Sequence, residues 1–558
     1  MDIGSNLAQG LLFQAAVWAL LVAILWDLLF RSSFPLKNLA FFSVFIGLSG
    51  PQYHDFPNPL GTGSLLFTGA LILLVHFWLH GGMTRYVTAL IMFGFLPLIQ
   101  FVGVMLVAGV IAGMIVAQAL CRRPWREMAI AAVVPTLVAG IGYCLSIGSL
   151  HAFAVYIKSS SELASGYNVA MSISGSKLEL LAALATVPVL IFALVLVAKS
   201  NRETALFLSC IFAAPFVVSM KHAIVRQDSH VVYIFSFVAL AGAIVALATS
   251  LDSQRTSTLI TTMVMVIGLM AFDVTELALP NVINSVSGSS APYLAWHALR
   301  FADLRQELSD KEIEDIPTGV AIEPQIKAII QDQPIASLST WYSNAVMEDL
   351  NLVLYPVIQR YSAYTPYLDK LNADWVRDKG PRFLIFDGNS IDRRHPWTET
   401  PAMWAEVYRW YDTRLLGIHN LLLERRHDPR FTHFEPLTRQ HLRSGEELLI
   451  PTSPQPLFWT MKCSLSTGGR LRAIFWKIDD VTMRVDKIGR RSRDFRVVLP
   501  VLSSPSIGNF LPNSLAEFAA VFASEQQQSF SVNKLKFAGP GMRAYSPDCD
   551  VQFLRPTL

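Results

Sequence analysis

Charged residues are scarce in this chain of 558 residues: they make up 16% of it, whereas hydrophobic residues make up 52%. The mean hydropathy of +0.41 excludes an ordinary soluble protein and a disordered chain. The deficit is uneven, because residues 1–277 hold 24 charged residues and the remaining 281 residues hold 63. This split predicts a membrane domain followed by a soluble domain. The net charge of +3 is a sum over both, so it does not support nucleic-acid binding.

Cysteine is also rare, and the familiar motifs of nucleotide and metal binding are missing. Three of the five cysteines lie in or beside apolar runs, and only Cys463 and Cys549 lie in the soluble half. In an oxidising compartment those two could form a disulfide, or they could be separate buried thiols. The sequence has no Walker motif, Rossmann fingerprint, GxSxG elbow or HExxH helix. We therefore expect no cofactor and no metal.

Apolar runs in the first half predict about ten membrane spans, since a spanning helix needs about 20 apolar residues. The candidates are Leu11–Phe30, Asn38–Gly50, Ser64–His80, Tyr86–Gln100, Gly103–Leu120, Met128–Gly148, Leu178–Ala198, Thr204–Ser219, Val231–Ala248 and Ser257–Val274. The stretch from Tyr86 to Leu120 is either a hairpin around Pro97 or one long helix, and the second reading would give nine spans.

Loop charges favour the even number of spans. With both chain ends outside the cytoplasm, each cytoplasmic loop contains at least one Lys or Arg, as the positive-inside rule requires. The soluble half is then extracytoplasmic. The first residues carry Asp2 and no basic segment, so the first apolar run is expected to be a retained span rather than a cleaved signal peptide. The long outside segment Ser149–Lys177 is expected to begin as a helix lying flat on the membrane.

The predicted fold is an α-helical multi-pass membrane domain (1–277), a stalk (278–335), a small α/β unit (336–440) and a jelly-roll-like β-sandwich (441–558). Strand-like runs, such as Leu350–Val357 and Phe383–Phe386, alternate with helical runs, such as Met403–Tyr411, and this alternation predicts the α/β unit. Short strands of alternating polar and apolar residues, Arg470–Trp476 among them, are separated by turns and predict the sandwich. Sandwiches of this kind commonly bind carbohydrate, although a fold alone does not establish a function.

The most informative segment is Met220–His230, between two expected spans on the outer side, where few basic residues are expected. Lys221, His222 and Arg226 could bind a phosphate or pyrophosphate group. Asp228 or a neutral His230 could then remove a proton from an acceptor hydroxyl. The alternative is that these side chains reach toward lipid headgroups and cap two helices.

Two further places carry candidate residues. The loop before the third span contains His54 as a candidate binding residue and Asp55 as a candidate base, although a proline-rich turn with one solvated carboxylate is the more common explanation. In the soluble half, Gln359, Arg360, Tyr361 and Tyr364 follow an apolar run, and the loop 387–396 follows the next one. Both would meet at one sheet edge, where sugar rings could stack on the tyrosines; an ordinary loop and helix start is the alternative.

The architecture resembles the integral-membrane glycosyltransferases of the GT-C type and their polysaccharide polymerase and ligase relatives. The stretches GYNVAMSISG, KHAIVRQDSH and QRYSAYTP are similar to uncharacterised bacterial multi-pass proteins of surface-polysaccharide loci. The resemblance implies a polyprenyl-phosphate-linked saccharide as donor, a glycan acceptor, and a site on the outer face of the bacterial inner membrane. The GT-C enzymes usually carry two acidic residues in the first large outside loop, where this chain has only His54 and Asp55.

We therefore expect a membrane protein of envelope polysaccharide assembly that transfers sugar from a lipid-linked donor. A transporter or flippase for a lipid-linked saccharide is one alternative, although the expected spans contain few charged residues. The other is a non-catalytic scaffold whose outside domain binds glycan or protein. The sequence leaves open whether the chain is an enzyme.

Overall fold

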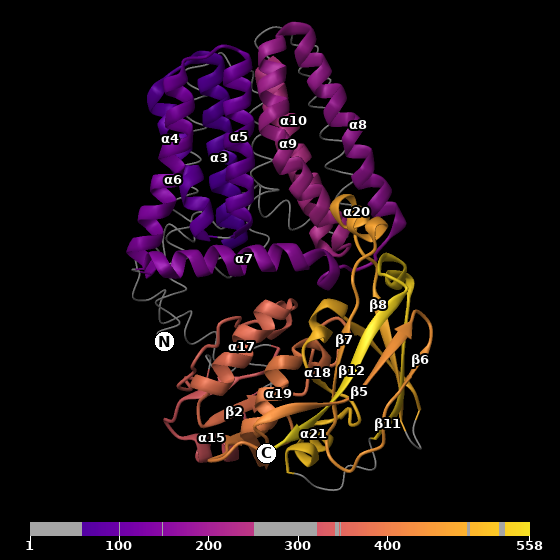
Figure 1. The fold of residues 1–558 in the computed structure, drawn as a ribbon. Helices are drawn as coiled ribbons and strands as arrows, with labels where there is room; N and C mark the ends of the chain where they lie inside the picture. The colour runs from indigo at the N-terminus through magenta and orange to yellow at the C-terminus, as the bar shows by residue number, and fades with distance from the viewer. Residues whose placement is uncertain are drawn as a thin grey trace. The chain divides into compact units, whose positions relative to one another are not determined.

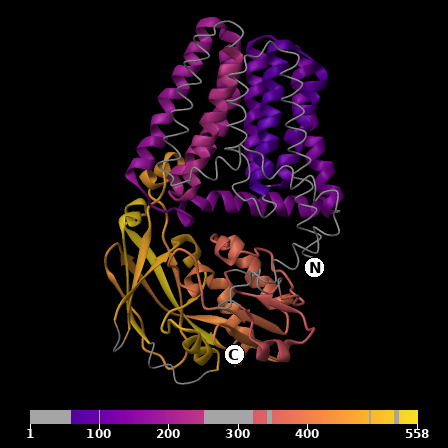
Figure 2. The same ribbon diagram turned by 180° about the vertical axis from the view of Figure 1, so that it is seen from behind.

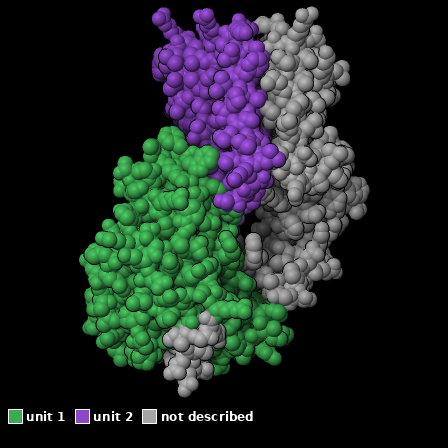
Figure 3. Space-filling model, turned by 90° about the vertical axis from the view of Figure 1, so that its right-hand side faces the viewer, with its two compact units in different colours: residues 1, 157–173, 310–558 green, residues 2–156, 174–309 purple. Residues whose placement is uncertain are grey.

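The computed structural model describes residues 59–249, except 100 and 148, and residues 321–558, except 341–344, 346–347, 488–490 and 524–530. The described residues form two compact units (Figure 3). Unit 1 holds Ile157–Ile173 and the residues from Asp310 onward; unit 2 holds those of Asp2–Tyr156 and Ser174–Ser309. The chain therefore enters unit 1 early, returns to unit 2, and comes back to unit 1 for its last part.

Unit 2 is helical. Its elements are α3 (Pro59–His80), α4 (Met83–Ile99), α5 (Phe101–Leu120), α6 (Trp125–Ile147), the start of α7 (Leu150–Ala170), α8 (Lys177–Ser200), α9 (Arg202–Val225), the short η1 (Ser229–Val231) and α10 (Val232–Thr249). Helices α5 and α9 pack closely at two glycines. A Cβ atom at Gly109 would lie 2.2 Å from the Cβ of Ala214, and one at Gly113 would lie 2.2 Å from the carbonyl oxygen of Cys210. Small residues at such spacing let apolar helices approach closely.

Four of the described helices are long and apolar enough to cross a membrane: Phe101–Leu120, Trp125–Ser146, Lys177–Ser200 and Arg202–Val225. The predicted number of ten is corrected to these four within the described residues. The apolar parts of α3, α4 and α10 are shorter than a span requires. The predicted spans Leu11–Phe30, Asn38–Gly50 and Ser257–Val274 lie outside the described residues. The stretch around Pro97 forms two helices, so the single long helix is wrong. The chain has the character of a multi-pass membrane protein.

The first part of unit 1 mixes helices with a four-stranded sheet. It contains α15 (Pro324–Ile330), β1 (Ile335–Ser337), η2 (Arg360–Ser362), α17 (Pro366–Lys379), β2 (Phe383–Phe386), α18 (Pro396–Glu399), α19 (Pro401–Trp410), β3 (Tyr411–Leu416) and β4 (Leu421–Arg425). The strand order is β1-β2-β4-β3, and only the β1–β2 pair is parallel. The predicted strand Leu350–Val357 is wrong, because within it only Leu352 forms an isolated bridge, to Ile335.

The second part of unit 1 is built from antiparallel strands (Figure 1). Its elements are β5 (His433–Arg443), β6 (Glu447–Leu449), β7 (Phe458–Lys462), α20 (Thr467–Phe475), β8 (Val481–Lys487), β9 (Arg493–Val497), η3 (Leu499–Ser503), β10 (Ser506–Ile507), α21 (Leu515–Phe522), β11 (Val532–Ala538), η5 (Pro540–Ala544) and β12 (Asp548–Thr557). Two four-stranded sheets, β10-β7-β12-β5 and β6-β11-β8-β9, face each other across one apolar core.

The sheet that contains β7 and β12 is buried on both faces. Trp459 and Phe553 point into the core between the two sheets. Phe458 and Leu554, the neighbouring positions on the same strands, join Trp404 in the core of the α/β part. Successive residues of a strand point to opposite faces, so one sheet serves both cores. The two parts predicted as separate modules therefore pack together as one unit.

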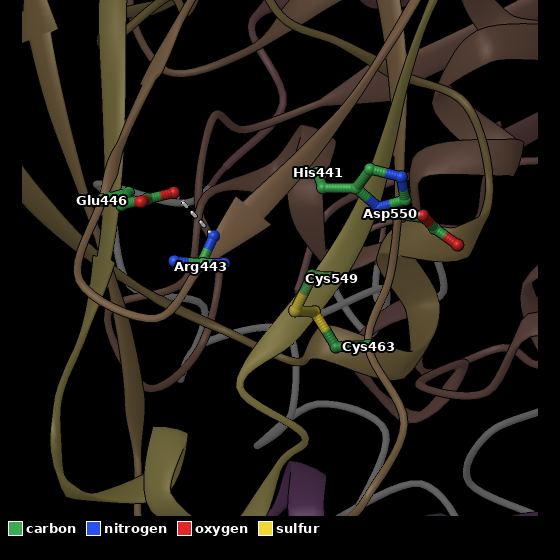
Figure 4. The surroundings of a disulfide bond; sticks show 6 residues. All are labelled: His441, Arg443, Glu446, Cys463, Cys549 and Asp550. Atoms are coloured by element: carbon green, nitrogen blue, oxygen red, sulfur yellow. Dashed lines mark hydrogen bonds and ion pairs between the residues drawn. A yellow bond between two sulfur atoms is a disulfide. The ribbon is translucent and has the colours of Figure 1, made fainter.

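A disulfide joins Cys463, just after β7, to Cys549 in the neighbouring strand β12 (Figure 4). The predicted pairing is thus present in the structure. Beside it, His441 Nδ1 lies 2.8 Å from Asp550 Oδ1, and the backbone N–H of Arg443 donates to Glu446 at 2.9 Å. Disulfides persist in oxidising compartments. The bond fits an extracytoplasmic location of this part of the chain.

Candidate functional site

The candidate site in unit 2 begins where helix α9 ends. The backbone N–H of Arg226 donates to the carbonyl of His222 at 3.1 Å, and the chain then leaves the helix through Gln227. The Gln227 side chain accepts from the N–H of Gly175 at 3.3 Å. A Cβ atom at Gly175 would lie 2.2 Å from the carbonyl oxygen of Gln227, so only glycine permits this approach. The segment before α8 thereby fixes the loop that follows α9.

Asp228 organises this loop. Its Oδ2 accepts from Arg226 Nε at 2.8 Å, and its Oδ1 lies 2.5 Å from His230 Nδ1. Oδ1 also accepts from the backbone N–H of His230 at 3.1 Å. Partial burial raises the pKa of Asp228, but the hydrogen bonds from His230 and the charges of His230 and Arg226 outweigh it and bring the pKa to about 2. Asp228 is therefore a carboxylate at physiological pH.

Aromatic rings surround His230. The His222 ring centroid lies 5.1 Å from that of His230, and Tyr233 lies 5.0 Å from His222 and 5.9 Å from His230. Because Asp228 engages Nδ1, it selects the tautomer and orients the ring so that Nε2 is the nitrogen available for chemistry. The structure thus brings four predicted residues together: His222, Arg226, Asp228 and His230. Lys221 immediately precedes His222 on α9 and is half-buried.

The other predicted site residues lie elsewhere. His54 and Asp55 fall outside the described residues. In unit 1, Arg360 approaches the predicted loop 387–396, because its guanidinium donates to the Asn389 carbonyl at 2.7 Å. Arg360 is 1% exposed and pairs with the equally buried Glu399 at 2.9 Å. Its polar atoms are used inside the unit, as expected for a buried charge. Gln359 is exposed and Tyr361 is half-buried.

Tyr364, predicted as a stacking platform, is buried against helix α7. Its hydroxyl donates to the carbonyl of Leu163 at 2.6 Å, and burial raises its pKa. A Cβ atom at Gly166 would lie 2.7 Å from the Tyr364 ring, so glycine is required at this contact. Lys158 Nζ lies 4.2 Å from the centroid of the Tyr367 ring. The 157–173 segment is therefore packed into unit 1, and its role there was not predicted.

Asn168 is the main polar attachment of that segment. Its Nδ2 donates to the carbonyls of Ala473 at 2.7 Å and Trp476 at 2.8 Å, which close the end of α20. Its Oδ1 accepts from the backbone N–H of Ile478 at 2.9 Å. Ser172 adds a bond to the Ile478 carbonyl at 2.6 Å. One side chain thus satisfies three backbone groups more than 300 positions away.

Two buried arginines hold the end of α7. The carbonyl of Ala170 accepts from Arg394, and from Arg496 at 2.8 Å. Arg496 also pairs with Asp392 at 3.2 Å and with Asp480 at 3.0 Å. Removing one partner of a buried ion pair leaves the other charge uncompensated, which is strongly destabilising. These residues gave no local signal in the sequence, because each pairs with residues far along the chain.

The three stretches that carry the resemblance are linked by this segment. GYNVAMSISG (166–175) contacts Tyr364 of QRYSAYTP in unit 1 through Gly166, and contacts Gln227 of KHAIVRQDSH in unit 2 through Gly175. Among the described residues, no cluster of three or more His, Cys, Asp or Glu side chains could hold a metal ion. No family model, curated protein or solved structure matches this chain.

Proposed function

We propose that this chain is a membrane protein of bacterial envelope polysaccharide assembly, which transfers sugar from a polyprenyl-phosphate-linked donor at the 222–230 site. The observation that carries the proposal is the chain of contacts from Arg226 through Asp228 to His230, at the end of one candidate span and the start of an apolar helix. The site combines a basic residue, a carboxylate and an oriented imidazole. This combination suits a donor lipid with an anionic headgroup and an acceptor with a reacting hydroxyl.

Arg226 is suited to the phosphate of the donor. A guanidinium presents several donors in a fixed plane and binds phosphate oxygens bidentately. Its Nε donates to Asp228 Oδ2 at 2.8 Å. A phosphate bound by the same guanidinium would therefore be connected to Asp228 through one side chain. Lys221, one residue before His222 on α9, can add a second positive charge.

His230 is suited to proton removal. The acceptor hydroxyl oxygen forms a bond to the anomeric carbon of the donor sugar as the bond from that carbon to the phosphate oxygen breaks. The hydroxyl proton passes to His230 Nε2, and the negative charge of the leaving phosphate is stabilised by Arg226. Asp228 holds the ring and stabilises the imidazolium that forms.

The test uses cells whose only copy of the chain carries one substitution. We expect His230→Gln to lower surface-polysaccharide synthesis at least ~100-fold, the effect of losing a general base, with normal protein level in the membrane. Arg226→Ala should abolish binding of polyprenyl pyrophosphate to the purified protein. The matched control is Arg202→Ala, which removes an exposed arginine at the other end of the same helix.

The outcomes separate the alternatives. Normal polymer from the combined Arg226, Asp228 and His230 variant would refute catalysis and favour the non-catalytic scaffold. Sugar transfer is supported if Arg226→Ala loses both polymer synthesis and donor binding while flipping of the donor across vesicle membranes is unchanged. Lost flipping in that variant would favour the transporter.

A further inference from the structure

Helix α20 presents an exposed apolar face. Leu471, Ile474 and Phe475 are 59%, 61% and 73% exposed. Their spacing of three and four residues places them on one side of the helix. The opposite side faces the protein, where a Cβ atom at Gly469 would collide with the carbonyl oxygen of Ala544. Large apolar residues clustered on an exposed helix mark a surface that meets another phase or another molecule.

The charge of α20 favours an anionic partner. The helix, Thr467–Phe475, contains Arg470 and Arg472 and no acidic residue. Arg470 is exposed, whereas Arg472 pairs with Asp479 at 2.6 Å. A basic helix with one apolar face is the pattern of segments that lie in the membrane interface, with the apolar side in the acyl boundary and the basic side toward anionic headgroups.

The connectivity of the chain limits how far α20 can be from a membrane. Lys477, two residues after the helix, donates to the carbonyl of Ile173 at 3.0 Å. Four residues after Ile173, Lys177 begins α8, a candidate span of 24 residues. Four residues reach at most ~14 Å when extended. In any arrangement of the two units, the end of α20 therefore stays close to the first residue of a candidate span.

We propose that α20 is a membrane-docking helix, whose Leu471, Ile474 and Phe475 insert into the lipid interface next to the start of α8. The occupant is the bilayer that holds the spans of the same chain. Helix α20 lies at one tip of unit 1, at the end opposite α21, in both views (Figures 1 and 2). Docking through this tip anchors unit 1 at a second point, independent of the chain connections. The proposal does not rest on the proposed function.

The test places a fluorophore on α20 in the full-length protein. Cys121, Cys144 and Cys210 are replaced by alanine, and the disulfide is kept. An environment-sensitive dye is attached to Phe475→Cys, or in the matched control to Ile418→Cys, an 83% exposed position in the β3–β4 turn of the same unit. The proteins are reconstituted in phosphatidylethanolamine and phosphatidylglycerol vesicles with or without lipid-borne nitroxide quencher.

We expect blue-shifted emission at position 475 and several-fold stronger quenching by the lipid nitroxide than at position 418. Equal quenching at the two positions overturns the proposal. Blue-shifted emission without lipid quenching also overturns it, because the cover is then protein, such as a second copy of the chain. As a check free of cysteine changes, benzoylphenylalanine at position 475 should crosslink to lipid; crosslinks only to protein would again count against the membrane.

Discussion

Replacing Asn168 by alanine should release the 157–173 segment from unit 1. The side chain donates to two carbonyls, of Ala473 and Trp476, and accepts from the N–H of Ile478. The residue is buried, so water does not readily replace these bonds. The substitution removes no charge and only a small volume. The lost hydrogen bonds are therefore the main change.

The magnitude follows from the number of bonds. A buried hydrogen bond contributes about 1 kcal/mol, and groups left unsatisfied add to the loss, so Asn168→Ala should cost about 3 kcal/mol. Opening of the segment would become about a hundred-fold more frequent, since 1.4 kcal/mol corresponds to a factor of ten. Asn168→Asp should cost at least as much, because a carboxylate oxygen would face the carbonyl oxygens of Ala473 and Trp476.

Hydrogen exchange of the full-length protein in lipid nanodiscs measures this effect. Amides that depend on local opening exchange faster in proportion to the opening equilibrium. We expect faster exchange at Ile478 and across residues 157–173. The matched control is Asn509→Ala, whose side chain also makes three bonds, to the carbonyls of Ser453 and Gln455 and from the N–H of Leu457.

The Asn509→Ala control should speed hydrogen exchange in residues 453–457 and leave residues 157–173 protected from exchange. Equal protection of 157–173 in Asn168→Ala and the unmodified protein would refute the assignment of Asn168 as an attachment point. Faster exchange of the segment in the Asn509 variant would show that unit 1 loosens as a whole rather than at this contact.

Two predictions concern the stability of unit 1 and are measured by pulse proteolysis in urea. Burial lowers the pKa of His395 from 6.5 to about 3, although its bond to the Pro512 carbonyl opposes the shift. The unfolded state therefore binds a proton at His395 more readily than the folded state. The free energy of unfolding should be unaffected by this group above pH 6.5 and should fall by about 1.4 kcal/mol per pH unit as the pH drops toward 3. An unchanged dependence of the unfolding free energy on pH in His395→Gln would contradict this. The Cys463–Cys549 bond closes a separation of 86 residues, so reducing it should lower the free energy of unfolding by up to about 4.5 kcal/mol; an unchanged urea midpoint would count against this estimate.

Sequence patterns predicted elements whose local signal agrees with their packing. The strand Phe383–Phe386 was predicted with the bounds it has, because four consecutive apolar residues are buried on both faces. The stretch Arg470–Trp476 was predicted as a strand and is mostly helix α20. Its polar and apolar residues alternate at first, but Ser466 caps a helix by accepting from the N–H of Gly469 at 3.0 Å.

The candidate site was partly predictable from the sequence, because several of its residues are close together along the chain. Arg226, Asp228 and His230 lie within five residues, so one turn brings them together. The buried position of Arg360 was not predictable, because it depends on Glu399 and on a backbone carbonyl of a distant loop. Within the described residues the number of spans was overestimated, because apolar runs shorter than a bilayer crossing look the same in sequence as buried helices.

The 157–173 segment, which is part of unit 1, limits where the chain can be cut into separate fragments. A fragment of residues 310–558 would lack Asn168 and the Ala170 carbonyl, so Arg394 and Arg496 would each lose one acceptor and the end of α20 would lose its bonds to Asn168. During synthesis, residues 157–173 emerge long before strand β12, which pairs with both β5 and β7. We therefore expect residues 310–558 to be incomplete as a transferable module, because residues 157–173 belong to the same compact unit. A gene fusion or truncation between residues 249 and 321 would separate the two parts of this unit.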